Sequence, residues 1–492
     1  MAKFQKKDGD IVSLTNEGVE KIKQHGNNYD QASKPIAPEE RDWSAWNLSS
    51  LWIGIIVSIA TYQIASGLIV SGMAWYQALF TIVLGHTLVM IPAIMLGHFG
   101  TKFGMSFPML AKMMFGIKGS IIPALVRAIV GIFWFGIQTW IGGQAVNIII
   151  GLVVPPWKSL GFAGMFISFL IFWALNVFIT QSGAKGVKIL ETYSAPALIT
   201  LSVIVVVWAL SVADWSFNTL FTQPAVSGGR GNFMLLFFPA LSAMIAFDGG
   251  PALSMADFTR HTKSQKSQVL GQIIIAPIMA AYIAFVGICG TSASSIAFGE
   301  AIWEPAILVS KFENPLIVLI FSLFIIAAVL TTNVAGNLVP PSIAFSTLFP
   351  KKFSYNKAVI FSAGLGLLTM PWYTMSNPES FINVFLGGLG TLLGPITGLF
   401  IASYWFELKQ RASIVDLYRD DGGQYYYEKG WNKEMTIVFA IFTVLIVAGA
   451  VFPPLKFMFD NSYVLGGGLT GITYYIVVRT KRKLNESATD ID

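Results

Sequence analysis

The residues best suited to chemistry are polar groups set inside long apolar stretches of the chain. In MIAFDGGPALSMADF, Asp248 is followed by Gly249, Gly250 and Pro251, a combination that interrupts a helix. An ionisable group inside an apolar membrane helix costs on the order of 2.5–3.5 kcal/mol and commonly marks a functional site. Asp248 therefore has two interpretations. It is the N-cap of a second half-helix, or it contacts the substrate or carries a proton.

A second cluster of polar residues lies in the apolar stretch LWIGIIVSIATYQIASG. It consists of Ser58, Thr61, Tyr62 and Gln63. Inside a membrane, an irregular backbone is tolerated only where it is buried in protein or lines a cavity. Two interrupted helices at corresponding positions of two halves of a chain indicate a transporter with its binding site at the breaks. The two stretches together predict such a site.

The stretch FWFGIQTWIGGQ holds Trp134, Gln138 and Gln144. Trp134 and Gln138 are four residues apart and so share one helix face. An indole surface beside an amide suits a flat ring that carries hydrogen-bond donors and acceptors. The alternative is a packing tryptophan with amides that bond between helices, and spacing alone favours that alternative.

The stretch IIAAVLTTNVAGNLVPPS offers oxygen ligands. Adjacent hydroxyls at Thr331 and Thr332 suit a hard cation such as Na⁺. Asn333 and Asn337 add two amides four residues apart. The alternative is that each threonine bonds back to a carbonyl of its own helix.

The composition identifies the elements that must position these residues as membrane helices. Of the 492 residues, 54% are hydrophobic and only 12% are charged, with 46 Gly, 38 Phe and 14 Trp. The single Cys289 excludes a disulfide scaffold or a cysteine metal site. His25, His86, His98 and His261 are widely scattered, and we find no nucleotide-binding motif. We therefore expect neither an enzyme nor an organic cofactor.

The fold class expected is an all-α integral membrane protein with twelve transmembrane helices, because apolar stretches of span length recur after Trp46. The predicted spans are 49–72, 76–98, 122–152, 160–180, 190–212, 233–256, 269–293, 314–346, 357–373, 380–406, 434–453 and 463–479. With a cytoplasmic N-terminus, most of the 32 Lys and Arg residues fall in inner segments. The outer loops hold Lys158, Arg230, Lys311 and Lys456. This sidedness explains the net charge of +6, so no nucleic-acid partner is expected.

The predicted organisation is a five-plus-five inverted repeat with broken first and sixth helices, plus two extra helices. Residues 1–45 form a cytoplasmic tail without a cleavable signal peptide. Residues 46–212 form the first repeat and residues 213–406 the second. Residues 407–480 hold an inner loop and the last two spans, and residues 481–492 form the cytoplasmic C-terminal tail. We expect a monomer in a plasma or bacterial inner membrane, with the lipid bilayer as its surroundings.

Several stretches in order resemble the nucleobase:cation symporter-1 family. They are GTKFGMSFPMLAKMMFGIKGSIIPALVRA, FWFGIQTW, ADFTR, TTNVAGNLVPP with STLFPK, and LGPITGLFIASYWF followed by VDLY. The resemblance covers about residues 42–480 and is nearest to bacterial hydantoin and allantoin permeases. It implies the inverted-repeat fold of the sodium-coupled amino-acid transporters. It also implies cation-coupled transport of a small heterocycle.

The resemblance also implies a substrate site. The family's stacking tryptophan matches Trp134, its neighbouring amide matches Gln138, and its eighth-span asparagine matches Asn337. The polar position of the first span is Ser58 here, a shorter group that leaves more room for the ligand. The tryptophan that sandwiches the ligand's other face falls on Asp248, whereas a shift of one residue places Phe247 there.

For the cation, the resemblance implies backbone carbonyls of Gly54, Val57 and Ala328 and the hydroxyls of Thr331 and Thr332. Both hydroxyls are present, which favours Na⁺ over a proton as the coupling ion. The function expected is import of a small nucleobase-like heterocycle by Na⁺ symport and alternating access. The alternatives are proton symport through Asp248, or an amine or amino-acid carrier of the same fold.

Overall fold

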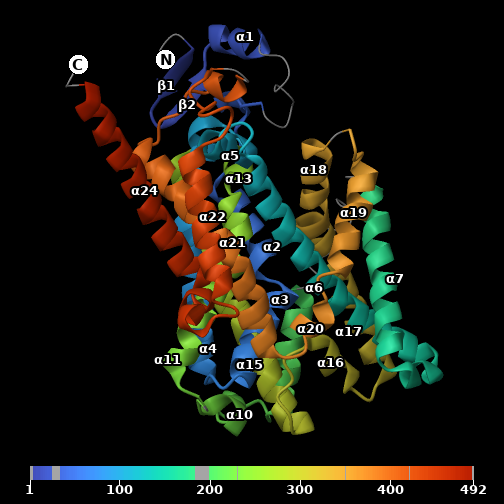
Figure 1. Ribbon diagram of the computed structural model, residues 1–492. Helices are drawn as coiled ribbons and strands as arrows, with labels where there is room; N and C mark the ends of the chain where they lie inside the picture. The colour runs from blue at the N-terminus through green and yellow to red at the C-terminus, as the bar shows by residue number, and fades with distance from the viewer. Residues whose placement is uncertain are drawn as a thin grey trace.

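The computed structural model describes residues 4–24, 34–182, 199–229, 231–349, 351–419 and 422–489. The described strands, β1 (Gln5–Asp8) and β2 (Ile11–Leu14), form an antiparallel hairpin, and helix α1 (Asn16–Gln24) follows. The hairpin lies at one end of a helical bundle (Figure 1). Its Gln5 side chain donates to Ala412 O and accepts from Ile414 N, both in the loop that follows residue 407. The two segments predicted to be cytoplasmic therefore lie together.

Six helical stretches among the described residues are long and apolar enough to cross a membrane. They are α4 (Trp75–Phe103), α6 (Ile121–Val153), α7 (Phe162–Gln181), α14 with α15 (Gln265–Phe298), α17 through α18 (Pro315–Leu348) and η5 through η6 (Ser380–Glu407). Two bent pairs raise the number to eight: α2 (Ala45–Ile56) with α3 (Ile59–Val70), and α22 (Lys433–Ala448) with Pro453–Asp460.

The other predicted spans correspond to shorter or more polar helices. They are Ile199–Val212, α11 (Phe233–Phe247), α19 (Tyr355–Leu367) and α24 (Ser462–Thr489). The beginning of the fifth predicted span, residues 190–198, lies outside the described residues. The count of twelve spans therefore stays a prediction, while the helical membrane architecture is confirmed.

Short elements connect the long helices. They are η2 (Pro38–Glu40), α5 (Phe107–Phe115), η3 (Pro155–Leu160), α9 (Phe217–Phe221), α10 (Pro224–Ser227), α12 (Gly249–Leu253), α13 (Ala256–Thr259), α16 (Pro305–Ser310), α20 (Pro371–Thr374), η7 (Val415–Tyr418), η8 (Pro453–Leu455) and α23 (Lys456–Asp460). Within the long stretches, α14 is Gln265–Ile273, α15 is Ile275–Phe298, α17 is Pro315–Thr332, α18 is Val339–Leu348 and α21 is Gly387–Ile401. The intervening π-helical turns are η4 (Asn333–Leu338), η5 (Ser380–Leu386) and η6 (Ala402–Glu407).

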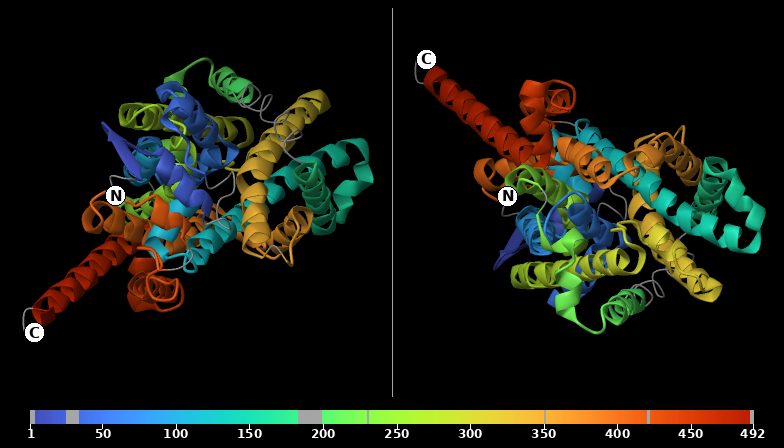
Figure 2. Two further views of the ribbon diagram at one scale, coloured as in Figure 1. Left: turned by 90° about the horizontal axis from the view of Figure 1, so that it is seen from above. Right: turned by 90° about the horizontal axis from the view of Figure 1, so that it is seen from below.

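The long helices form two packed groups (Figures 1 and 2). In one group α3 and α4 pack against α11, α12, α14 and α15; in the other, α6 packs against α7, α17, α18 and α19. Each group draws helices from both predicted repeats, so the repeats do not pack as separate domains. Close packing relies on glycine: a Cβ at Gly85 of α4 would lie 2.5 Å from the Met244 side chain of α11.

Candidate functional site

The first predicted break is confirmed. Helix α2 ends at Ile56, α3 begins at Ile59, and the two axes differ by 53°. Ser58 is the N-cap of α3: its Oγ accepts from Thr61 N at 3.2 Å and lies 3.0 Å from Thr61 Oγ1. The cap satisfies backbone donors that the break exposes in an apolar interior. Gln63, one turn further along, is buried, and its amide has no hydrogen-bond partner among the described residues.

The second predicted break is also confirmed, but the capping role of Asp248 is not. Helix α11 ends at Phe247 and α12 begins at Gly249, yet the Asp248 side chain makes no capping hydrogen bond within the described residues. Its backbone has φ −91° and ψ 2°, whereas an N-cap residue needs an extended conformation to aim its oxygen at the following N–H groups. The Asp248 carboxylate therefore does not bond to the backbone N–H groups at the start of α12.

The Asp248 carboxylate contacts a histidine that the sequence did not single out. Nδ1 of His86, on α4, lies 2.5 Å from Asp248 Oδ2, and the two side chains are 0% and 1% exposed. A buried carboxylate requires such a partner because its desolvation is expensive. The available signal was a histidine inside the apolar helix 75–103, which also holds His98. His86 and Asp248 are 162 positions apart in the chain, so their contact could not be read from the sequence.

Trp134 lies against the second break. Its ring is nearly perpendicular to that of Phe247, with centroids 5.1 Å apart, and to that of Phe385, with centroids 4.9 Å apart. The side chain is only 8% exposed. The predicted pairing of Trp134 with Phe247 is therefore a contact, but its geometry is edge-to-face. A ring stacked on Trp134 requires that one phenyl ring moves aside, because parallel rings need a face free of other atoms.

Gln138 of α6 and Thr332 of α17 meet within the second helix group. The Thr332 hydroxyl donates to Gln138 Oε1 at 2.8 Å and lies 3.2 Å from the carbonyls of Ala328 and Val329. A small cavity beside this contact is lined by Ser58, Ile59, Ala60, Gln138, Ile141, Ala328, Val329 and Thr332. Two predicted substrate residues, Ser58 and Gln138, therefore share this cavity with two predicted cation ligands, Ala328 and Thr332.

The remaining predicted cation ligands do not line this cavity. Thr331 donates to Ala327 O at 2.9 Å, the back-bonding geometry of membrane threonines. Gly54 lies on an exposed part of α2. Val57 lines a larger, almost wholly apolar cavity, and Ser58, Tyr62 and Ser202 are among the other residues that line it. We favour the smaller cavity as the polar site, because a heterocycle needs hydrogen-bonding groups that the larger cavity hardly offers.

Asn337 lies in the π-helical turn η4. Its Nδ2 donates to Asn333 Oδ1 at 3.1 Å, and Asn333 Nδ2 donates to Thr139 Oγ1 at 3.0 Å. A Cβ added at Gly131, one turn before Trp134, would lie 3.0 Å from Asn337 O. These contacts hold η4 against α6, and π-helical turns of this kind are frequent at functional sites.

Gln144 belongs to a different part of the molecule. Its Nε2 donates to Glu304 Oε2 at 2.7 Å, in the loop between α15 and α16. This bears out the interhelical interpretation of Gln144. Glu304 is 6% exposed, and burial raises the pKa of its carboxyl to about 7, although the hydrogen bond with Gln144 acts in the opposite direction.

We expect Glu304→Gln to remove a pH dependence of stability. The folded carboxyl has a pKa near 7 and its ordinary value is 4.5, so between these values the folded state binds more protons and loses stability as the pH rises. The total effect is on the order of 3 kcal/mol, at about 1.36 kcal/mol per pKa unit. Melting temperatures of the purified protein on either side of this window measure it. Relative to wild type, the variant should gain stability above neutral pH.

The matched control is Glu300→Gln, which alters an exposed glutamate of the same loop that pairs with Lys311. This control should keep the wild-type pH profile. An unchanged profile in Glu304→Gln would contradict the assignment of the titration to Glu304.

These features define a class of protein. Apolar helices of span length make the chain a multi-pass membrane protein. The two helix breaks lie beside Trp134 and Gln138, which share one face of α6. Broken helices around a central site are typical of membrane transporters. Residues 35–466 match the family model described as permease for cytosine/purines, uracil, thiamine, allantoin. The chain belongs to this family of permeases, the nucleobase:cation symporter-1 family, and is a transporter of heterocycles rather than an enzyme.

Relatives and solved structures agree with this assignment. The chain is 34% identical to the purine-uracil permease NCS1 of Arabidopsis thaliana, over 90% of this chain and 77% of the relative. It is 32% identical to the allantoin permease of Bacillus subtilis, over 90% and 92%. It also resembles the inward-facing conformation of Mhp1, with a TM-score of 0.76 and 26% identity, covering 92% of this chain and 94% of that one. The likeness to closed Mhp1 with bromovinylhydantoin bound has a TM-score of 0.72.

Proposed function

We propose that this protein is a secondary active symporter that couples Na⁺ to the import of a small nucleobase-like heterocycle. The substrate would be allantoin, a hydantoin, a purine or pyrimidine, or a related vitamin. The observation that carries the proposal is the meeting of Ser58, Gln138 and Thr332 at one cavity, with Trp134 and the Asp248 break on the same two helix groups. Two movable groups with polar residues between them suit alternating access.

Each substrate-site residue has a role that its chemistry supports. Trp134 supplies a face for stacking, and Gln138 supplies an amide for in-plane hydrogen bonds. Ser58, Phe247 and Asp248 bring the two helix breaks to the ligand. Asn337 completes the predicted set from η4. Its amide now bonds to Asn333, so it must exchange this partner when it binds the ligand.

The predicted cation site uses Thr331 and Thr332 with the carbonyls of Gly54, Val57 and Ala328. Each threonine hydroxyl donates its hydrogen to an oxygen acceptor, which leaves lone pairs for a cation. The hydrogen bond from Thr332 to Gln138 directly connects the cation site with the substrate site. A substrate that donates a hydrogen bond to Gln138 Oε1 competes with the Thr332 hydroxyl for this oxygen, and the hydroxyl is then released to bind the cation.

The test of this function is uptake into proteoliposomes with the purified protein. A labelled panel of uracil, cytosine, adenine, allantoin and hydantoin should include at least one ligand that accumulates under an inward Na⁺ gradient. Accumulation that needs a proton gradient but no Na⁺ would instead support proton symport through Asp248. Proton symport is the second candidate mechanism because Asp248 is buried against the ionisable His86. Uptake of amines or amino acids alone would contradict the heterocycle assignment.

We expect Thr332→Val to reduce Na⁺-dependent substrate affinity at least tenfold, about 1.4 kcal/mol. Valine keeps the shape of threonine but removes the hydroxyl oxygen and its hydrogen bond to Gln138. Thr332→Ser keeps the oxygen and should stay close to wild type. Titrations of substrate at several Na⁺ concentrations measure the effect, and unchanged Na⁺ dependence in Thr332→Val would remove Thr332 from the cation site.

We further propose that the protein lies in a plasma or bacterial inner membrane with both termini cytoplasmic, as the distribution of Lys and Arg predicts. The N-terminal hairpin and the loop after residue 407 lie at the same end of the bundle, which agrees with this orientation. We also propose that the protein works as a monomer.

A further inference from the structure

A further cavity with polar walls lies between α6, η3, α16 and the start of α17, apart from the candidate substrate site. Its volume is about 580 Å³, within the range of roughly 300–1,000 Å³ that small-molecule sites occupy. Helix α16 lies at the end of the bundle opposite the N-terminal hairpin (Figure 1), which is the predicted outer side. The polar side chains and the indole that line this outer cavity are those of Gln144, Asn147, Trp157, Lys158, Ser310 and Glu313.

Gln144 and Asn147 offer hydrogen-bonding groups at the outer cavity. They are three residues apart on α6 and therefore lie on the same face of the helix. Gln144 Nε2 donates to Glu304 Oε2, while Gln144 Oε1 is buried without a partner among the described residues. Asn147 Oδ1 accepts from Trp157 Nε1 at 2.8 Å, and because an indole N–H can only donate, Asn147 Nδ2 stays available as a donor. One acceptor and one donor are therefore available on this face.

This pattern is complementary to a cyclic amide or ureide, in which a ring N–H stands beside a carbonyl. A buried acceptor without a partner is costly, so a ligand N–H that reaches Gln144 Oε1 removes that cost. Glu304 and Trp157 hold the two amides in place, which lowers the entropy lost when a ligand binds. The rim has one exposed lysine, Lys158, and one exposed glutamate, Glu313, so it suits a neutral polar ring better than an ion.

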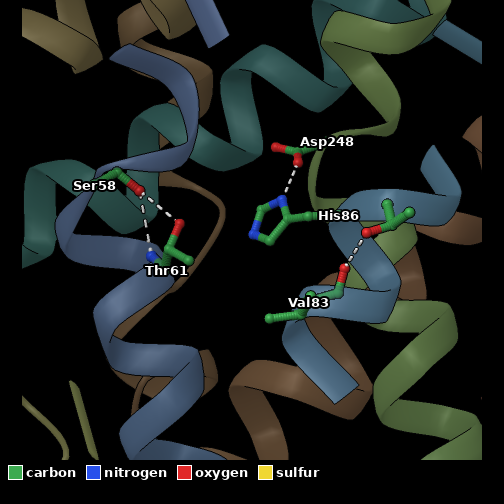
Figure 3. Close-up of polar contacts among 6 residues, drawn as sticks. Ser58, Thr61, Val83, His86 and Asp248 are labelled. Carbon is green, nitrogen blue, oxygen red and sulfur yellow. Dashed lines mark hydrogen bonds and ion pairs between the residues drawn. The ribbon is translucent and has the colours of Figure 1, made fainter. Parts of the chain in front are cut away.

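The outer cavity adjoins the cavities already described. Helix α16 separates it from the larger apolar cavity: different residues of α16 line each of them, and Phe312 lines both. Ser58, which caps α3 at the first helix break (Figure 3), lines both the apolar cavity and the small polar cavity. The three cavities therefore follow one another from the outer end of the bundle to the first break.

We propose that the outer cavity is a second binding site for a cyclic amide or ureide, which the ligand occupies before it reaches the cavity of Ser58 and Gln138. The ligand N–H donates to Gln144 Oε1, its neighbouring carbonyl oxygen accepts from Asn147 Nδ2, and its ring packs against Trp157. The ligand class rests on the proposed function, but none of the outer residues belongs to the candidate substrate site.

The experiment is a count of binding sites on the full-length protein in lipid nanodiscs. Equilibrium dialysis with radiolabelled allantoin, hydantoin and uracil gives the number of ligand molecules bound per chain at saturation. Wild type should bind two molecules of at least one probe. Ser310→Trp fills the outer cavity from an exposed position of α16, so this variant should bind one. Asn147→Asp keeps the acceptor for Trp157 but loses the donor to the ligand, and it should also bind one.

Two controls make the loss specific. Ser159→Trp adds the same bulk at an exposed serine of η3 that is not among the residues lining the outer cavity, and it should still bind two molecules. Trp134→Ala weakens the central site alone, so the affinity of the outer site should keep its wild-type value.

The outcomes separate the two proposals. One bound molecule per wild-type chain, together with normal uptake, would overturn the outer site and leave the transport function intact. Two bound molecules in Ser310→Trp would place the second site elsewhere and overturn its assignment to this cavity. A phospholipid that copurifies with wild type but not with Ser310→Trp, measured as phosphorus per chain, would overturn it in favour of a lipid site. Failure of every probe to bind would contradict the heterocycle assignment, and with it this proposal.

Discussion

Asp248→Asn is expected to weaken substrate binding roughly tenfold to a hundredfold while changing the melting temperature only modestly. Hydrogen bonds to a charged group contribute about 1.5–3 kcal/mol, and asparagine removes the charge but not the shape. Stability should change little because Asp248 makes no capping hydrogen bond within the described residues, and because an asparagine oxygen still accepts from His86 Nδ1. Affinity and melting temperature are measured on the same preparation.

The same variant separates a binding role from a proton-carrying role. A proton carrier that lacks its carboxylate should bind substrate normally and exchange it across the membrane, but lose pH-driven accumulation. Asp460→Asn, at a partly exposed aspartate paired with Lys456, is the matched control and should behave as wild type. Wild-type affinity together with wild-type accumulation in Asp248→Asn would contradict both roles and leave Phe247 as the ligand contact at this break.

Trp134→Ala is expected to weaken binding by roughly 1–3 kcal/mol, the range for a ring stacked on an aromatic side chain. Because the indole also packs against Phe247 and Phe385, some loss of stability accompanies this change. Trp134→Phe keeps an aromatic face and should recover part of the affinity. Ligand affinity and melting temperature of the three proteins separate the stacking contribution from packing.

Trp140→Phe provides the control on the same helix. Trp140 faces the other way, against Phe169 and Trp372, so phenylalanine should be tolerated there. Loss of uptake in Trp140→Phe with normal uptake in Trp134→Ala would show that the other face of α6 binds the substrate.

The structure also revises how the site is understood. The substrate amide Gln138 and the cation ligand Thr332 were predicted for different ligands, yet they share a hydrogen bond. Asp248 was interpreted partly as a helix cap, yet it pairs with His86. Both contacts join helices that are distant in the sequence.

The sequence by itself determined the membrane class, the positions of both helix breaks and the family of permeases. These are local properties: an apolar run of span length is helical in lipid, and Asp-Gly-Gly-Pro favours the end of one helix and the start of another because glycine is flexible and proline lacks an N–H. The face shared by Trp134 and Gln138 likewise follows from helical periodicity alone.

Only the tertiary structure decided which polar groups meet. The partner of Asp248 depends on how α4 packs against α11 and α12, which a close approach at Gly85 permits, and nothing near residue 248 in the sequence specifies His86. The same holds for Gln144 with Glu304 and for Gln138 with Thr332. A buried side chain takes its hydrogen-bond partner from whatever element packing brings within about 3 Å, and that proximity is a property of the whole fold.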